Sequence, residues 1–207
     1  MDLIKKAVAE AAGQFGAEEY ELTISSMENT KVEALKKEIS TVSYARSGTM
    51  RVRCVVNGRS GYASSELVTP EAAAMIVETA CDNALVLDEA DQVGLFAGSD
   101  HYETSRDTAI CLPSADELKN RALKLQELAY AASDTIVDGT ESIVSGMNIT
   151  EDVVNSAGLQ LHYEAGLVYQ GLMAAVKDGG EASDDFCLTD ISKKTVEQTV
   201  DKAVSGA

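Results

Sequence analysis

The fold is decided at residues 50–65, which read MRVRCVVNGRSGYASS. Residues 50–56 alternate as a half-buried strand does. The two expected faces are an apolar one with Val52 and Cys54 and a basic one with Arg51 and Arg53. Asn57-Gly58 follows at once and favours a two-residue turn, because both central positions of that turn need a positive φ angle. The stretch therefore predicts two antiparallel strands joined by a tight hairpin.

The sequence around this hairpin predicts further strands and two helices. Residues 20–25 and 41–44 alternate between polar and apolar side chains and indicate strands. Residues 3–15 place apolar side chains three and four positions apart, which is typical of an amphipathic helix. Thr69-Pro70 supplies a helix cap followed by proline at the first helical position. Residues 1–88 are thus expected to form a first helix, strands and helix.

A second set of elements is expected after a break. Residues 89–113 show no sustained period and contain one of the two prolines, so they indicate a linker or excursion. Ser114 and Glu117 have the spacing of a capping box and begin a new helix. Alternating strand-like stretches follow at 140–149, 159–163 and 169–176. We therefore expect residues 114–207 to repeat the order of the first part.

Comparison of the two parts supports an internal duplication. Residues 51–58 lie over 171–178, a shift of 120 (171 − 51), and 76–80 lie over 196–200 at the same shift. Side-chain identity is slight, so the alternative is a coincidence of generic element order. We predict an α+β fold of two tandem helix/antiparallel-strand/helix repeats.

Composition indicates a globular protein and argues against some partners. Apolar residues make up 45% of the 207 residues, and the formal net charge of -17 repels nucleic-acid phosphates and anionic lipids. We expect no direct nucleic-acid binding and no membrane association, since no run of 18 apolar residues occurs. Four scattered cysteines favour buried free thiols in a reducing cytoplasm, namely Cys54, Cys81, Cys111 and Cys187.

No complete catalytic or metal site can be found in the sequence. His101 and His162 lack the spacing with carboxylates that a zinc helix needs. Ser25-Ser26 and Ser64-Ser65 lack the glycine elbow and the nearby base that activate a serine nucleophile. The acidic stretches miss the alternating oxygen ligands of a calcium loop. We therefore assign no catalytic residue and no metal ligand to this chain.

Basic side chains gather in the hairpin of an otherwise acidic chain. One interpretation is pairing with carboxylates across the strands, and this is the one that we favour. The other is a contact surface for an anionic group, such as a peptide carboxylate. The residues of that surface would be Arg46, Arg53 and Arg59, with Arg51 in the same hairpin.

Residues 47–53 (SGTMRVR) and 57–65 (NGRSGYASS), the Thr-Pro-Glu helix start at 69–71, and Ala80-x-x-x-Ala84 together resemble the N-terminal region of the PmbA/TldD family. Its members were named as modulators of DNA gyrase. The resemblance covers the whole chain in element order, is sharpest from 42 to 88, and is closer to PmbA, also called TldE. The positions that match the family pattern are expected to be architectural, namely Gly48, Arg51, Gly58 and Gly61.

The resemblance implies a role in cytoplasmic proteolysis, with PmbA and TldD acting as a pair on unfolded peptides. In the family, zinc is held in a C-terminal β-rich domain by a His-Glu-x-x-x-His type motif, and no residues here match it. The chain stops at Ala207, after the helix that leads into that domain in family members. We therefore expect zinc in a partner or in that further domain, and no cofactor in this chain.

The expected function is that of the N-terminal, substrate-admitting and subunit-pairing region of a PmbA/TldD-type metallopeptidase complex. Such a region is not catalytic by itself. The expected partners are a TldD or PmbA subunit, in a homodimer or heterodimer, and unfolded peptide substrates. The alternative is a protein-interaction module of the gyrase-modulator type that has no proteolytic role.

Overall fold

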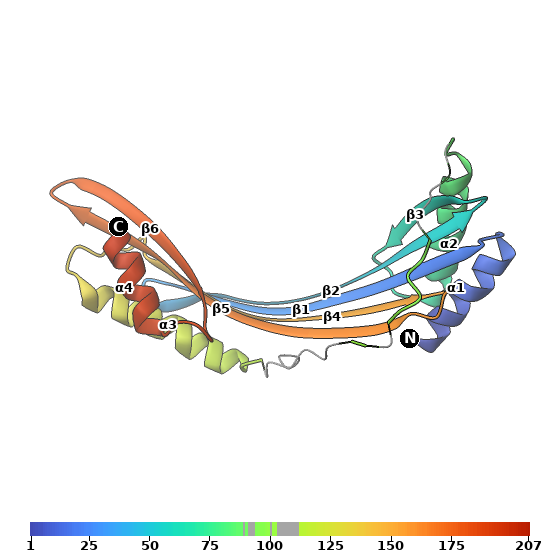
Figure 1. Ribbon diagram of the computed structural model, residues 1–207. Helices are drawn as coiled ribbons and strands as arrows, with labels where there is room; N and C mark the ends of the chain where they lie inside the picture. Colours follow the sequence, from blue (N-terminus) through green and yellow to red (C-terminus); the bar gives the residue numbers. More distant parts are fainter. Residues whose placement is uncertain (89, 91–93, 100, 103–111) are drawn as a thin grey trace. The chain divides into compact units, whose positions relative to one another are not determined.

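The computed structural model describes residues 1–88, 90, 94–99, 101–102 and 112–207. Four helices and six strands occur in these residues (Figure 1). The helices are α1 (Asp2–Gln14), α2 (Pro70–Leu85), α3 (Ala115–Ala132) and α4 (Val196–Gly206). The strands are β1 (Glu19–Leu35), β2 (Glu38–Val56), β3 (Arg59–Ser65), β4 (Glu141–Asn155), β5 (Gln160–Asp178) and β6 (Glu181–Asp190). The predicted α+β class is confirmed.

The strands form one sheet in the order β3-β2-β1-β4-β5-β6. By its contacts the chain divides into two compact units. Unit 1 takes its described residues from Met1–Met27, Arg46–Thr108 and Ile149–Glu164, and unit 2 takes its own from Glu28–Ala45, Ala109–Asn148 and Ala165–Ala207. Strands β1, β2, β4 and β5 each contribute to both units. The division predicted at 1–88, 89–113 and 114–207 stays a prediction, and much of 89–113 lies outside the described residues.

The hairpin predicted from residues 50–65 is confirmed. Strands β2 and β3 pair antiparallel, with Val56 opposite Arg59. Asn57 and Gly58 have φ angles of 52° and 71°, so both occupy the left-handed region that this two-residue turn needs. Gly58 has no side-chain penalty there, and asparagine is among the residues that tolerate it best.

The strands around this hairpin are longer than the sequence indicated. The predicted pieces at 20–25 and 41–44 are parts of β1 and β2, which have 17 and 19 residues. Lys36 and Lys37 form the turn between them with φ angles of 54° and 65°. Lysine rarely takes this conformation, so nothing in the composition of the turn marks it as a hairpin.

Side-chain caps begin three of the helices, and two of these caps are the ones that the sequence predicts. Thr69 Oγ1 accepts from the Ala72 amide at 3.2 Å, and proline follows at the first helical position of α2. Ser114 and Glu117 form the expected capping box of α3. Thr195 and Gln198 form a second box at α4. These caps satisfy amide groups that a helix start leaves without partners.

Each unit has its own aliphatic core. In unit 1, α1 and α2 pack together over one face of the sheet, with Val8, Leu22, Val52 and Val77 almost fully buried. In unit 2, α3 and α4 cover the sheet, and the central side chains are Leu118, Leu125, Val144 and Leu172.

A buried polar side chain links β5 to both helices of unit 2. Gln170 is fully buried, and its Nε2 donates to the Thr195 carbonyl at 2.9 Å and to Thr199 Oγ1 at 2.8 Å. Its Oε1 accepts from Arg121 Nε of α3. A buried amide is stable only with such partners, so this network fixes the positions of α3 and α4 on β5.

The element order repeats, but a single register does not. The two tight turns lie at Asn57-Gly58 and Gly179-Gly180, a shift of 122 (179 − 57) rather than 120. The caps of α2 and α4, Thr69 and Thr195, differ by 126 (195 − 69). Side chains alternate between the two faces of a strand, so any even shift between the two halves of the sequence places apolar residues over apolar residues. The shift of 120 therefore aligned the apolar positions without aligning the turns. Internal duplication therefore stays a prediction.

Every helix in the described part of the chain is too short or too polar to cross a membrane. Cys54, Cys81 and Cys187 are free and buried, as predicted, and Cys111 lies outside the described residues.

Candidate functional site

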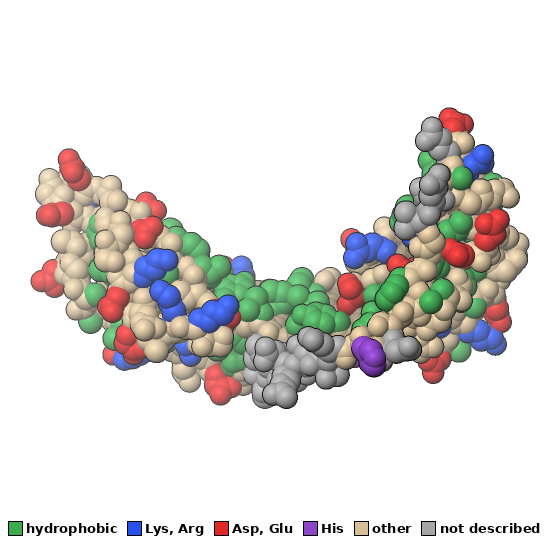
Figure 2. All heavy atoms as spheres, viewed as in Figure 1, with side chains coloured by type: hydrophobic (Ala, Val, Ile, Leu, Met, Phe, Trp, Pro, Cys, Tyr) green, Lys and Arg blue, Asp and Glu red, His purple; other side chains and the backbone are tan. Residues whose placement is uncertain are grey.

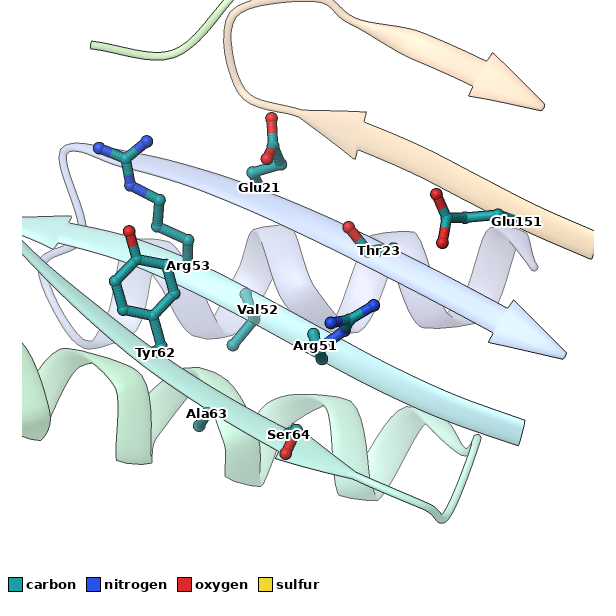
Figure 3. A pocket seen from close by; sticks show the side chains of 9 residues that line it. All are labelled: Glu21, Thr23, Arg51, Val52, Arg53, Tyr62, Ala63, Ser64 and Glu151. Carbon is teal, nitrogen blue, oxygen red and sulfur yellow. The ribbon is translucent and has the colours of Figure 1, made fainter. Parts of the chain in front are cut away.

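A hollow of about 570 Å³ lies on the face of the unit 1 sheet that the helices leave uncovered (Figure 3). Four neighbouring strands contribute to its wall. The lining residues are Glu151 of β4, Glu21 and Thr23 of β1, Arg51, Val52 and Arg53 of β2, and Tyr62, Ala63 and Ser64 of β3. Two guanidinium groups, two carboxylates, a phenol and two hydroxyls thus gather on one open surface.

The alternation of each strand explains why these side chains meet. Val52 faces the helices and is 1% exposed, so Arg51 and Arg53 point to the opposite face, as the sequence predicts. Arg53 lies opposite Tyr62 in the β2–β3 pair, and Arg51 lies opposite Ser64. In Figure 3 the Tyr62 ring lies beside the Arg53 side chain.

The carboxylates of the hollow are held by neutral donors. Glu21 accepts from Asn155 Nδ2 at 3.2 Å, and Glu151 accepts from the Ser25 hydroxyl at 2.9 Å. These bonds fix both carboxylates and leave their charge in place. The hollow therefore offers fixed negative groups next to cationic ones.

The two arginines differ in how they are held. Arg53 donates from Nε and Nη2 to the buried Ser60 hydroxyl, at 3.0 and 2.9 Å. Arg51 is exposed and forms no hydrogen bond or ion pair with the residues that the structure describes. The cross-strand carboxylate pairing expected for this hairpin is therefore not seen at Arg51. Its guanidinium has donors available for a ligand.

The three arginines predicted as a contact surface are not brought together. Of these three arginines, Arg53 lines the hollow and the other two do not. Arg46 is exposed on β2 and lines a separate depression with Gly48, Glu66 and Val68. Arg59 is partly buried, and its Nε has no hydrogen-bond partner among the described residues. Its odd position on β3 directs it to the helix-covered face.

Each glycine of the family-like pattern has its own local environment. A Cβ at Gly61 would lie 1.9 Å from the Ala80 carbonyl oxygen and 2.4 Å from the Ala84 nitrogen, so β3 approaches the α2 backbone directly there. Gly58 needs its positive φ. Among the described residues, a Cβ at Gly48 would come closer than 3.4 Å to one atom, Val68 Cγ2, at 2.9 Å.

Nucleophilic chemistry has no support among these residues. Ser25 bonds to Glu151, Ser26 to Thr150 at 2.6 Å, and Ser65 to the Leu67 backbone, and none of them has an imidazole base. Burial raises the pKa of the Cys54 thiol to about 12, with the neighbouring Cys81 as a smaller cause. Such a thiol stays protonated and unreactive at neutral pH.

Metal ligation has no support either within the described residues. No group of three or more His, Cys, Asp and Glu side chains could hold an ion there. His162 is exposed and its Nδ1 lies 3.1 Å from Asp152, while His101 is exposed near Ser99. The absence of zinc from this chain stays a prediction.

Several residues of the hollow were not among the predicted site residues. Glu21 and Thr23 are the polar positions of the alternation at 20–25, which marked a strand without marking a site. Glu151 is 100 positions from Arg51 (151 − 51), and only the neighbouring positions of β4 and β1 bring it to the hollow. Tyr62 could have been found from its pairing with Arg53 across the predicted turn.

Residues 20–84 match the family model described as PmbA/TldA metallopeptidase domain 1. This segment contains the hairpin and most of the residues that line the hollow. Among curated proteins, none matches the chain.

Solved structures with the same fold cover nearly the whole chain. One is a candidate modulator of a DNA gyrase from Thermotoga maritima, with 17% identity, a TM-score of 0.79, and coverage of 98% of this chain and 46% of its own. TldE from Thermococcus kodakarensis has 20% identity, a TM-score of 0.79, and coverage of 98% and 46%. A candidate modulator of DNA gyrase from Bacteroides thetaiotaomicron has 14% identity, a TM-score of 0.83, and coverage of 99% and 48%. The chain thus spans less than half the length of these proteins, and at such identities the likeness shows the fold.

Proposed function

The chain belongs to the PmbA/TldD family through residues 20–84, which carry its first domain, and on that premise we propose that it admits substrate and pairs subunits in a peptidase complex. The complex is cytoplasmic and acts on unfolded peptides. This region binds and does no chemistry, and zinc belongs to a partner or to the family's C-terminal domain. Within the family it is of the PmbA, or TldE, type.

The hollow of unit 1 is the observation that carries this proposal. It combines open access with fixed groups of both charges, and the described residues around it contain no activated nucleophile and no metal-ligand cluster. Such a surface is suited to binding and poorly suited to hydrolysis. A separate catalytic domain would then have to break the bond.

Arg51 and the carboxylates have complementary uses in peptide binding. The guanidinium of Arg51 can donate to a peptide carbonyl or to a terminal carboxylate, and charge-assisted bonds of this kind are the stronger ones. Glu21 and Glu151 can accept from peptide amides or from a basic side chain. Because main-chain groups recur in every peptide, this mode of binding accepts many sequences.

Restriction to unfolded substrates follows from the same contacts. A segment can offer its main-chain groups only when they are not already paired within a folded protein. Strand addition at an edge of the sheet would add contacts of this kind that are independent of sequence. A folded globular protein presents few such segments and is not admitted.

The test of binding uses a fluorescein-labelled unfolded peptide and measures its anisotropy as the chain is added. Arg51→Ala should weaken binding about tenfold, since one charged hydrogen bond contributes roughly 1.5–3 kcal/mol. The matched control is Lys6→Ala, which removes one positive charge from an exposed helix position of unit 1. Equal affinity of both variants and the parent chain would contradict the role of the hollow.

The alternative is an interaction module of the gyrase-modulator type, and it is favoured only by the names of two structures with this fold. Co-purification separates the two functions. Retention of a TldD-type subunit by the immobilised chain, without retention of gyrase, supports subunit pairing. Retention of gyrase alone would overturn it.

A further inference from the structure

Among the strands that the structure describes, β6 pairs with β5 alone, and this leaves a row of unpaired backbone groups at the edge of the unit 2 sheet. The turn at Gly179-Gly180 places Asp178 opposite Glu181. In such a hairpin the residues that flank the turn exchange hydrogen bonds, and every second residue after them does the same. The N–H and C=O groups of the intervening residues therefore point away from β5, namely those of Ala182, Asp184, Phe186 and Leu188.

These outward groups have no partner among the residues that the structure describes. The strand has ten residues and contains neither proline nor lysine, which commonly protect an edge from pairing. It is therefore a free template for an added strand.

The other edge of the sheet, at β3, is partly covered. By the same alternation the main chain of Tyr62 points outward, and its carbonyl accepts from Asn83 Nδ2 of α2 at 2.8 Å. Helix α2 also approaches Gly61 so closely that a Cβ there would lie 1.9 Å from the Ala80 oxygen. Of the two edges, β6 is the one more open to an extended chain.

The exposed face of β6 has an apolar stretch beside an acidic one. Phe186 and Leu188 are each 53% exposed, and both fold toward Gly171, where an added Cβ would lie 3.0 Å from Phe186 Cζ and 3.1 Å from Leu188 Cδ1. Toward the turn the charges are negative. Figure 2 shows acidic side chains at the tip of the β5–β6 hairpin, at the left of the view.

Charge decides which strand this edge can receive. Residues 177–190 contain five carboxylates and one lysine. Pairing with a second copy of β6 would bring two such acidic strands together, and directly opposed like charges destabilise a sheet. A strand that carries lysine or arginine would instead be attracted, and its apolar side chains would lie beside Phe186 and Leu188.

We propose that the free edge of β6 binds an extended basic peptide segment as an added strand. The segment carries a basic side chain next to Asp184 and, at every second position further along, apolar side chains next to Phe186 and Leu188, because these three residues of β6 share one exposed face. This inference rests on the proposed function, peptide admission, and names the class of peptide that is admitted. The binding site that it assigns lies on unit 2 and is separate from the hollow that contains Arg51.

The experiment titrates the whole chain into a fluorescein-labelled peptide, Val-Thr-Val-Thr-Lys-Thr-Lys, and measures anisotropy; paired antiparallel to β6, this peptide has its valines and lysines on one face. Two control peptides are a version with N-methyl groups on alternate amides, which cannot extend a sheet, and a version with both lysines replaced by glutamate. We expect both controls to bind at least tenfold more weakly.

Two protein variants locate the binding site. Leu188→Pro removes an outward N–H from the edge and keeps the pairing with β5, because proline is tolerated at edge positions that face solvent. Ala115→Pro is the matched control: it removes an N–H at the exposed first position of α3, where proline is tolerated, outside both the β6 edge and the hollow. Leu188→Pro should weaken binding at least tenfold, and Ala115→Pro should leave it within twofold. Circular dichroism verifies that each variant is folded.

Three results would overturn the inference. The first is binding of the N-methylated peptide within twofold of the parent peptide. The second is equal binding of the glutamate peptide, and the third is unchanged affinity of a folded Leu188→Pro variant. A dimer of the free chain that sedimentation detects and that Leu188→Pro abolishes would assign the edge to a second copy instead. Should these tests fail while Arg51→Ala still weakens peptide binding and TldD-type capture persists, only the β6 assignment falls. If binding at β6 holds while capture and the Arg51 effect are absent, the proposed function falls.

Discussion

Replacing Gly61 by alanine forces a methyl group into the backbone of α2. The new Cβ would lie 1.9 Å from the Ala80 carbonyl oxygen, and that atom belongs to a helix backbone and cannot rotate away. Restoring an ordinary contact of 3.4 Å requires β3 and α2 to separate by about 1.5 Å (3.4 − 1.9).

The expected cost follows from the size of the gap. Strand β3 has seven residues, so the gap is about 24 Å long and about 4.8 Å wide, or roughly 170 Å³. At about 24 cal/mol per Å³ of cavity, the loss is about 4 kcal/mol if nothing relaxes. Partial movement of α2 would recover some of it, so we expect a loss of about 2–4 kcal/mol.

Amide hydrogen exchange of α2, followed by mass spectrometry, measures this loss within unit 1. Protection of the α2 amides in Gly61→Ala should fall roughly 30- to 700-fold. The matched control is Gly48→Ala, whose Cβ would meet the end of the exposed Val68 side chain, which can rotate away. Protection in Gly61→Ala that matches the control would refute the close approach of β3 to α2.

Three further predictions concern the turn, the caps and the thiols. Lys36→Asn should raise the midpoint of urea unfolding, because asparagine tolerates the φ of 54° better than lysine does. The ion pair with Asp138 that this change removes is largely exposed and contributes little to stability. An unchanged or lower midpoint would contradict strain in this turn. Hydrogen bonds from Ser114 hold the pKa of Glu117 below its usual range. The stabilisation of the folded state by the Glu117 carboxylate is therefore present above the unfolded-state pKa and is lost as the pH falls through the folded-state pKa. Glu117→Gln should make the free energy of unfolding less dependent on pH between about pH 5 and 3, and an unchanged pH dependence would count against the capping box. Cys54, with its pKa of about 12, should resist iodoacetamide at pH 8 until denaturant is added, and rapid labelling of the folded chain would contradict its burial.

Turns and helix starts were predictable from the sequence where residues close together in the chain determine them. Asn57-Gly58 defined a turn, and Ser114 with Glu117 defined a helix start, because each depends on residues no more than three positions apart. The Lys36-Lys37 turn was not predictable, because lysine has no preference for the left-handed conformation found there.

The site was only partly predictable because it depends on contacts between distant parts of the chain. The alternation at residues 50–56 placed Arg51 and Arg53 on one face correctly. Glu151 joins them only because β4 lies next to β1, and no local pattern contains that information. The shift of 120 between the two halves does not match the positions of the turns and helix caps. Alternation alone could not reveal this, because any even shift keeps apolar residues on the same strand face.

We propose that this chain binds unfolded peptide and that a separate domain carries out the chemistry. The most direct measurement incubates the chain with zinc and a labelled unfolded peptide, records anisotropy, and then weighs the peptide by mass spectrometry. We predict saturable binding and an intact peptide after prolonged incubation. Turnover that a chelator abolishes, or the absence of any binding, would contradict the claim.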